Sequence, residues 1–311
     1  MDGVFGIKDL VAGLLIVIAL LLTAVTGSAQ ANSWQDDAGV SWSKSSTQLE
    51  RWVVLGPHLV DMVEAIGASK RIVGVHDDYD NPSRRRTSVK GYPIVGQPGQ
   101  INEEYLRRVR PDLIVYWPDG MSPQQLQRVK QLGIPVLTIS PRRIEDIPER
   151  LRWLGWLSKQ EQAADIKAQQ LTLNLNKQRK YYAQGPRLRV FYQVWQTPLY
   201  TLSPDHLVSQ AMAICGADSI VPTSPVAAPV MSVEAILRER PDVILVSEHG
   251  HSSAQQFWSR FKHLPAVRTG AILAVNDKDL TRPGLSLLTA LPELCQQLKP
   301  WREQAGMRRL E

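Results

Sequence analysis

The sequence predicts an α/β protein of two similar lobes, each with a mainly parallel sheet flanked by helices, joined by one long rigid helix. Two observations support this fold class. A helix-to-strand unit occurs twice, at residues 102–117 and 232–247, and residues 159–183 between the copies contain neither proline nor glycine. Such a stretch, rich in Gln, Ala, Lys and Leu, is typical of a single helix of about 25 residues. The chain has 311 residues, enough for two domains with separate cores.

Each copy of the unit begins with a helix N-cap and an acidic first turn, which the helix dipole favours. A proline then ends the helix, and a compact run of apolar β-formers follows, as in a strand buried on both faces. The corresponding residues are Asn102, Glu104 and Pro111 in the first copy and Ser232, Glu234 and Pro241 in the second. The equal spacing indicates that the two lobes share one design.

The remaining elements follow from apolar runs and from turn residues. In the first lobe we expect strands at 51–55, 71–75, 113–116 and 136–139, and helices at 59–66, 103–110, 123–132 and 144–157. In the second lobe we expect strands at 188–193, 243–247 and 272–275, and helices at 207–214, 233–240, 254–261 and 285–298. Loops are expected at 76–92, 94–99, 194–205, 248–253 and 276–284.

The N-terminus predicts export. Residues 10–25 form an apolar run after Lys8, and Ala29 and Ala31 make a small-x-small cleavage pattern, so residues 1–31 are interpreted as a signal peptide in a periplasmic protein. An uncleaved inner-membrane anchor is the alternative, because the run is nearly long enough to span a bilayer. The expected divisions are a flexible lead at 32–49, a first lobe at 50–157, a connecting helix at 158–185, a second lobe at 186–300 and a basic tail at 301–311.

The net charge of +6 does not indicate a nucleic-acid partner. The basic residues are scattered over many segments, apart from Arg84–Arg86 and the C-terminal arginines, and no aromatic residues alternate with a basic track. We expect a basic solvated surface and a monomer. Cys215 and Cys295 are the only cysteines, and an even count in an oxidising compartment suggests a disulfide, with two buried free thiols as the alternative.

Aromatic and polar residues gather just after the predicted strands. In open α/β sheets, ligands bind at the carboxyl ends of the strands. The residues at these ends are Pro57, His58, Tyr79, Trp117, Trp195, Tyr200, His206, Asp277 and Arg282. Facing lobes would form a cleft with aromatic walls and few charges, which suits a large, flat, mostly apolar ligand.

Residues 50–300, nearly the whole mature chain, resemble the periplasmic binding proteins of ABC importers whose lobes are joined by a rigid helix. This class serves cobalamin, haem and ferric siderophores, and the cobalamin binders are most similar. The resemblance rests on residues 191–195 (FYQVW), 198–203 (PLYTLS) with His206, Cys215-Gly, 229–234 (PVMSVE) and 277–282 ahead of Cys295.

The resemblance implies a role for individual residues. It implies that Tyr79, Trp117 and Trp195 line the corrin, and that Asp277 and Arg282 hold the ligand's side chains at the cleft edge. It implies that Cys215 and Cys295 form a disulfide. It further implies that Glu104 and Glu234 dock onto arginines of an ABC permease dimer, although dipole capping explains each glutamate equally well.

The sequence departs from this pattern where Pro98 and Ala227 or Ala228 stand in place of expected aromatics. A ferric siderophore or haem is therefore the alternative ligand, but both are usually anionic, whereas a corrin carries neutral amides. Few cations are expected in the cleft, which favours cobalamin as a transported ligand, with no cofactor.

The sequence offers less support for two other functions. A metal-ion binding protein would need a ligand cluster, and His249-Gly-His251 beside Glu248 is only weak evidence for one, so no metal site is expected. An enzyme would need catalytic groups, but no nucleophile elbow, phosphate-binding glycine loop or zincin motif occurs. Asp77 and Asp78 are adjacent carboxylates in a polar loop. We therefore expect a binding protein and not an enzyme.

Overall fold

The computed structural model describes residues 33–43, 49–77, 91–97, 100–118 and 122–308. The chain divides into two compact units, one ending at Thr47 and the other beginning at Gln48. The second unit holds both lobes. Tyr79, Asp78, Arg84–Arg86, Pro98 and the leader at 1–31 lie outside the described residues.

The first unit contains a small antiparallel hairpin. Strands β1 (Ser33–Gln35) and β2 (Ser41–Ser43) place Trp34 opposite Trp42, and their rings stack with centroids 6.0 Å apart. The Asp36 carboxylate accepts the backbone N–H groups of Ala38 and Val40, both at 2.9 Å. Within the segment expected to be a flexible lead, residues 33–43 therefore form a hairpin, because Asp36 closes the turn and the indoles pair across the strands.

The first lobe is built on a six-stranded sheet with the order β6-β5-β4-β3-β7-β8. All neighbouring strands are parallel except β5 and β6, which form an antiparallel hairpin. The strands are β3 (Trp52–Leu55), β4 (Ile72–His76), β5 (Ile94–Gln97), β6 (Gln100–Ile101), β7 (Leu113–Tyr116) and β8 (Val136–Thr138). The expectation of a loop at 94–99 is wrong for β5, because Val75 and His76 of β4 pair with Ile94 and Gly96.

The second lobe is built on a four-stranded parallel sheet with the order β10-β9-β11-β12. Its strands are β9 (Leu188–Gln193), β10 (Ala217–Ser219), β11 (Val243–Ser247) and β12 (Ile272–Val275). The same order runs through β4-β3-β7-β8 of the first lobe, with the repeated unit supplying β7 and β11. The two-lobed α/β prediction is confirmed; only the short strand β10 was missed in this sheet.

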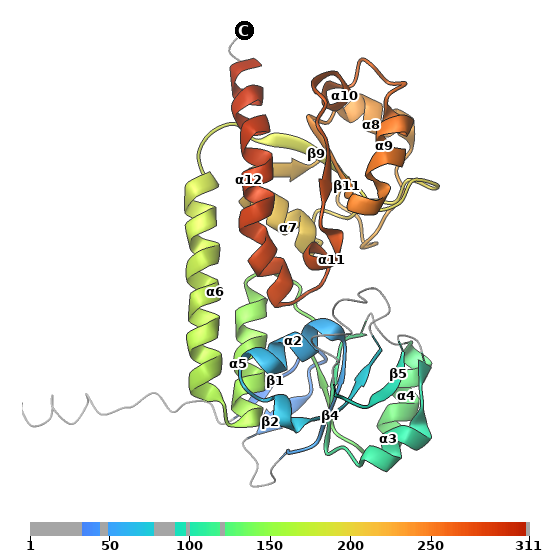
Figure 1. The fold of residues 1–311 in the computed structure, drawn as a ribbon, viewed down its shortest axis with the longest axis vertical. Coiled ribbons are helices and arrows are strands. Elements are labelled where there is room, and N and C mark those ends of the chain that lie inside the picture. Colours follow the sequence, from blue (N-terminus) through green and yellow to red (C-terminus); the bar gives the residue numbers. More distant parts are fainter. Residues whose placement is uncertain (1–32, 44–48, 78–90, 98–99, 119–121, 309–311) are drawn as a thin grey trace, which may run out of the picture. The chain divides into compact units, whose positions relative to one another are not determined.

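Helices cover both sheets (Figure 1). Those of the first lobe are α2 (Pro57–Ala65), α3 (Glu103–Val109), α4 (Pro123–Gln131) and α5 (Asp146–Ser158), with a 3₁₀ turn at Ser69–Arg71. Those of the second lobe are α7 (Leu207–Ile214), α8 (Val233–Glu239), α9 (His251–Trp258), α10 (Pro265–Thr269), α11 (Asp277–Leu280) and α12 (Leu285–Arg308), with a 3₁₀ turn at Glu248–Gly250. The expected loops at 248–253 and 276–284 thus contain short helical segments, begun by the caps Ser247 and Asn276.

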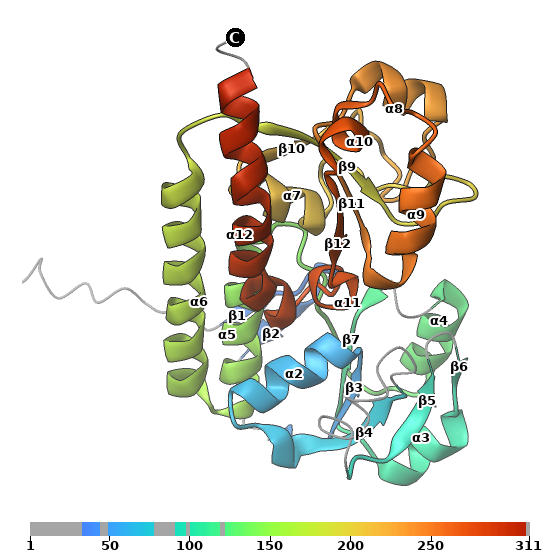
Figure 2. The same ribbon diagram turned by 45° about the horizontal axis from the view of Figure 1, so that its top comes forward.

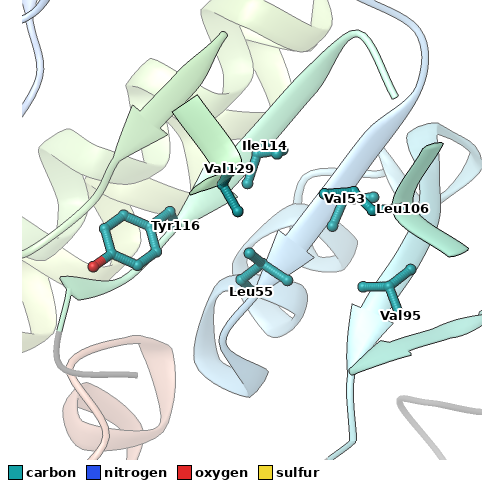
Figure 3. Packing of buried hydrophobic residues seen from close by; sticks show 7 residues of the cluster. All are labelled: Val53, Leu55, Val95, Leu106, Ile114, Tyr116 and Val129. Atoms are coloured by element: carbon teal, nitrogen blue, oxygen red, sulfur yellow. The ribbon is translucent and has the colours of Figure 1, made fainter. Parts of the chain in front are cut away.

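One face of the first sheet forms a core with α3 and α4 (Figure 3). Val53 and Leu55 of β3 lie directly beside Ile114 and Tyr116 of β7, and all four are at most 3% exposed. Leu106 of α3 covers them and is fully buried. Truncating Leu106 to alanine would lower the free energy of unfolding by about 2–5 kcal/mol. This core therefore holds the carboxyl ends of β3 and β7 in place.

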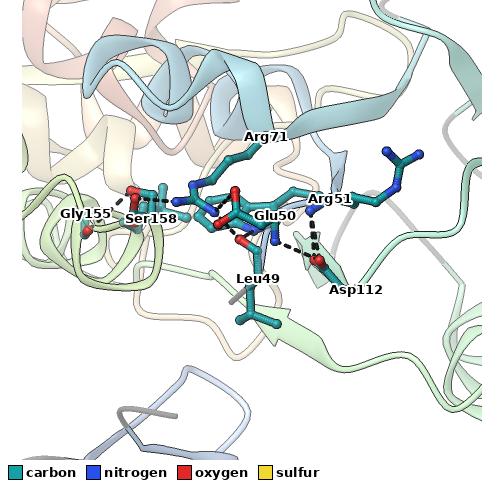
Figure 4. Close-up of polar contacts among 9 residues, drawn as sticks. Leu49, Glu50, Arg51, Arg71, Asp112, Gly155 and Ser158 are labelled. Atoms are coloured by element: carbon teal, nitrogen blue, oxygen red, sulfur yellow. Dashed lines mark hydrogen bonds and ion pairs between the residues drawn. The ribbon is translucent and has the colours of Figure 1, made fainter. Parts of the chain in front are cut away.

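The turn after each repeated helix is tied to the neighbouring strand by the same contacts. In the first lobe, the Asp112 carboxylate accepts the Arg51 backbone N–H (Figure 4), and the Arg51 guanidinium donates to the Val109 carbonyl at the end of α3. In the second lobe, Asp242 accepts the Arg189 N–H, and the Arg189 guanidinium donates to the Glu239 carbonyl at the end of α8. The repeat is therefore one of contacts as well as of sequence.

Helix α6 (Glu161–Tyr182) joins the lobes, and α12 runs beside it in both views (Figure 1, Figure 2). The 22 residues of α6 give a length of about 33 Å. It is shorter than expected because Lys159 has a left-handed backbone (φ 57°) and caps α5.

Helix α12 continues to Arg308, past the end expected at Leu298 and through the segment expected to be a basic tail. Pro300 does not end it, because Leu298, Arg302 and Ala305 lie on one buried face. The Arg302 guanidinium donates to the carbonyls of Pro186 and Gln184, both at 2.9 Å. Arg302 therefore fastens α12 to the turn that leads from α6 into β9.

A disulfide joins α7 to α12. Cys215 and Cys295 are bonded, with their Cα atoms 4.7 Å apart, as expected. On the chain-entropy model, a cross-link at a sequence separation of 80 stabilises a fold by about 4 kcal/mol. Within the described ranges, no helix combines the length and the apolar character needed to cross a membrane.

Candidate functional site

A pocket of about 780 Å³ lies at the carboxyl ends of the strands of the second sheet. Gln193 ends β9, Ser247 ends β11 and Asp277 comes just after β12, so three neighbouring strands deliver polar side chains to one place. The described residues that line it are Gln193, Val194, Trp195, Gln196, Thr197, Val246, Ser247, His249, Gly250, Ser253 and Asp277.

Trp195 and Asp277 are the two predicted site residues in this pocket. Trp195 is 64% exposed, and its indole N–H donates to the Thr197 carbonyl at 3.2 Å, which fixes the ring within the wall. Asp277 begins α11, where the helix dipole favours a carboxylate. Burial and the Asp277 charge both raise the pKa of the Tyr192 phenol, which stays protonated. Asp277 thus places one negative charge in a pocket whose described lining also holds the Trp195 ring and the carboxamides of Gln193 and Gln196.

Two other predicted residues of the second lobe lie outside this lining. Tyr200 forms isolated antiparallel bridges to Trp195 and Val230, so it supports the segment that carries the indole. His206 is the N-cap of α7, and its Nδ1 accepts the Val208 backbone N–H at 3.2 Å. Their predicted contacts with a ligand remain predictions.

The structure brings together His58 and Trp117 in the first lobe and Arg282 in the second. The His58 ring meets the Trp117 ring edge to face, with centroids 4.9 Å apart, and Pro57 is the first residue of the helix that positions it. Gly284 packs so closely on His58 that a Cβ there would lie 3.0 Å from the His58 Cβ. The carboxyl end of β3 therefore contacts the start of α12, and His58 acts as support for Trp117.

Burial lowers the pKa of His58 to about 3, and the nearby Arg282 charge adds to the effect. Burial likewise lowers the pKa of His76, at the end of β4, to about 4. Both Nε2 atoms are enclosed and have no hydrogen-bond partner among the described residues. Both imidazoles are therefore neutral at pH 7, and neither adds a cation to the cleft.

A second contact joins the lobes at α7. The Gln210 side chain accepts the Ile144 backbone N–H at 3.0 Å and donates to the Arg142 carbonyl at 2.8 Å. One carboxamide thus forms a two-bond bridge to the segment between β8 and α5. Together with α6, this bridge restrains movement of one lobe against the other.

Glu104 and Glu234 occupy the same place in each repeated unit. Each is the second residue of its helix, after the N-caps Asn102 and Ser232, whose side chains accept backbone N–H groups. Both glutamates are exposed, and neither forms an ion pair within the described part of the chain. The geometry leaves both carboxylates open to a partner.

Another cavity, of about 570 Å³, lies at the outer edge of the first sheet between the β5–β6 hairpin, α3 and α4. Its charged lining residues are Asp77, Glu103 and Arg128. The carboxyl ends of β4 and β5 border this cavity, but its described lining contains no aromatic side chain.

Among the described residues, the motif around His249 gathers too few ligands for a metal centre. The His251 ring is hydrogen-bonded to the Ile272 carbonyl at 2.8 Å, so only His249 faces the pocket. Across the described ranges, no three His, Cys, Asp or Glu side chains gather as metal ligands would.

The sequence reasoning missed several pocket residues, most of all Gln193. Its position as the last residue of a buried strand was the available signal, since side chains at strand ends face the ligand. Gln196 and Thr197 fall in the loop expected at 194–205. Their placement depends on the bridges between Trp195, Tyr200 and Val230, which no local sequence pattern predicts.

Comparison with known proteins agrees with this architecture. The family model described as periplasmic binding protein matches residues 53–278, most of the chain. The chain belongs to the periplasmic binding protein family. As predicted, it is a ligand-binding protein of ABC transport and not an enzyme.

Individual relatives refine the comparison. This periplasmic binding protein is 30% identical over 256 residues to the vitamin B12-binding protein of Pectobacterium carotovorum, covering 80% of this chain and 88% of that protein. The crystal structure of the periplasmic vitamin B12-binding protein of Vibrio cholerae matches with a TM-score of 0.72 at 28% identity, covering 81% and 97%. The periplasmic heme-binding protein of Vibrio cholerae matches with a TM-score of 0.68 at 19% identity, covering 80% and 99%, which shows a shared fold.

Proposed function

We propose that this periplasmic binding protein captures a cobalamin-type corrinoid and delivers it to an ABC importer. The observation that carries the proposal is the pocket of the second lobe, where Trp195 presents a largely exposed ring. A volume of about 780 Å³ accepts a large ligand, and an aromatic wall suits the apolar face of a macrocycle. Tyr79 and Trp117 of the first lobe would contact the opposite face.

The charge of the pocket favours a corrinoid over haem or a ferric siderophore. Among its described lining residues there is no lysine or arginine, and Asp277 is the one carboxylate. Haem propionates and most ferric siderophores are anionic, so they would meet repulsion from Asp277 in a lining that has no described lysine or arginine. The neutral amides around a corrin would meet a hydrogen-bond acceptor. We assign Asp277 this role, with Arg282 at the cleft edge.

Delivery would use the two exposed glutamates. Glu104 and Glu234 begin corresponding helices of the two lobes, so one carboxylate from each lobe can meet one half of a permease dimer. Exposed carboxylates contribute mainly to the rate and orientation of such an encounter. We propose that the protein binds the permease as a monomer in the periplasm, after export directed by residues 1–31. An uncleaved leader would tether it to the inner membrane.

A calorimetric titration of residues 32–311 with cyanocobalamin tests the role of Trp195. We expect one ligand to bind per chain, and Trp195→Ala to weaken binding at least tenfold through the lost ring contact. Trp153→Ala is the matched control, because Trp153 lies in α5 against Arg150 and outside the pocket. Equal affinity of the wild type and Trp195→Ala would remove Trp195 from the site.

A further inference from the structure

Gln193 has a polar side chain enclosed at the base of the ligand pocket. It is 6% exposed, and its Oε1 accepts the Trp258 indole N–H at 2.7 Å. Trp258 is fully buried behind the pocket and is not part of the lining, whereas Gln193 is. The hydrogen bond to Trp258 therefore holds Gln193 from the side away from the pocket.

This contact determines which way the carboxamide points. An indole N–H can only donate, so the atom beside it must be the carbonyl oxygen of Gln193, and Nε2 must point elsewhere. Within the described residues, Nε2 has no hydrogen-bond acceptor, and it is not among the fully enclosed polar atoms. The pocket is the open space beside Gln193, so Nε2 presents its N–H groups there.

The orientation is rigid because Trp258 cannot easily turn. Phe191, Phe257 and Phe261 surround its ring, with centroids 6.0, 5.0 and 5.7 Å away. An indole held by three aromatic rings keeps its N–H in one direction. The donor in the pocket is therefore set in place before any ligand binds.

We propose that Gln193 is a specificity-determining residue whose Nε2 donates a hydrogen bond to a neutral carbonyl oxygen of the ligand, with Trp258 as the positioning residue. This inference rests on the proposed function, in which the acceptor is a carboxamide at the edge of the corrin. Asp277 lines the same pocket and would repel a carboxylate, so an amide is the acceptor that suits both groups. A carboxamide also offers N–H groups that Asp277 can accept.

Three variants test this proposal by calorimetry with cyanocobalamin. Gln193→Met removes the donor at similar volume, and we expect about tenfold weaker binding because the ligand carbonyl loses its partner. Gln193→Glu keeps an acceptor for Trp258 but replaces the donor by a carboxylate oxygen, so it too should weaken binding. Gln297→Met is the control, since Gln297 already donates to the Ala274 carbonyl and lies outside the pocket.

A double-mutant cycle separates the donor from a packing effect. Trp258→Phe should weaken binding by itself, because the carboxamide is then free to turn, but it should cost little more in a Gln193→Met background. Full additivity of the two changes would overturn the role of Trp258.

Thermal unfolding of each variant checks that it folds. Wild-type affinity in both Gln193 variants would overturn the inference and leave the proposed function intact. If the wild-type protein bound no cyanocobalamin, the proposed function would be wrong, and so would the role of Gln193 in ligand binding.

Discussion

Arg110 and Arg240 stand at corresponding positions of the two lobes and share a left-handed backbone conformation, with φ of 46° and 49°. Each ends the helix of the repeated unit and precedes its proline. A proline disfavours helical backbone at the residue before it, which is why the chain leaves the helix there. In both lobes the aspartate after the proline then accepts the backbone N–H of an arginine at the start of the adjacent strand.

Replacing either arginine by glycine should stabilise the protein. A side chain in the left-handed region costs about 1 kcal/mol, and glycine removes that cost. The greater flexibility of glycine in the unfolded chain offsets part of this gain. We therefore expect Arg110→Gly and Arg240→Gly each to raise the free energy of unfolding by about 0.5 kcal/mol. Urea denaturation measures this, with Arg238→Gly inside α8 as a control that should destabilise. Loss of stability in both variants would show that the arginine side chains themselves matter.

Stability should fall as pH falls from 6.5 towards 4. The folded-state pKa values of His58 and His76, about 3 and about 4, lie below the ordinary 6.5, so the unfolded chain binds protons that the folded chain rejects. Their stabilisation is complete above pH 6.5. Each should lose about 1.5 kcal/mol between pH 6.5 and 5. Urea denaturation of the wild type and of His58→Gln between pH 6.5 and 5 measures this loss. If the free energy of unfolding depended on pH equally in both proteins, the lowered pKa of His58 would be contradicted.

Gly216→Ala should destabilise the protein more than an ordinary glycine substitution. Gly216 has φ of 75°, and a Cβ there would lie 2.4 Å from the Arg302 Cζ, so the buried guanidinium would have to move from its carbonyl partners. We expect a cost of about 2 kcal/mol or more. Gly133→Ala is the matched control, because it has φ of 70° with no atom within 4 Å and should cost only about 1 kcal/mol. Equal melting temperatures for the two variants would contradict the role of Arg302.

Reversing the two exposed glutamates should separate delivery from capture. Glu104→Lys with Glu234→Lys should abolish uptake of cyanocobalamin through the cognate permease while leaving calorimetric affinity within about twofold of wild type. Glu103→Lys changes the same charge in the same helix turn and should keep most uptake. If Glu103→Lys is equally inactive, the general charge of α3 and not Glu104 would explain the effect.

Local patterns predicted most of the fold, because caps and prolines act over a few residues. Residues 113–116, 188–193, 207–214 and 272–275 were predicted with the bounds that the structure has. The failures share a cause. β5 depends on pairing with β4, and α12 passes Pro300 because Arg302 is anchored by residues distant in sequence.

The candidate site was predictable only in part for the same reason. Trp195 and Asp277 could be found because they follow apolar strands directly. The orientation of the Gln193 side chain depends on its hydrogen bond to Trp258, which lies 65 positions away in sequence. No local sequence pattern connects the two residues.

A paired titration of residues 32–311 with cyanocobalamin and with haemin distinguishes a corrinoid-binding protein from a haem-binding one. The pocket's aromatic wall, its single described carboxylate and its lack of a described lysine or arginine predict saturable one-to-one binding of cyanocobalamin. They also predict at least tenfold weaker binding of haemin, whose propionates Asp277 would repel. Tight binding of haemin without binding of cyanocobalamin would show that the ligand is an anionic tetrapyrrole and not a corrinoid.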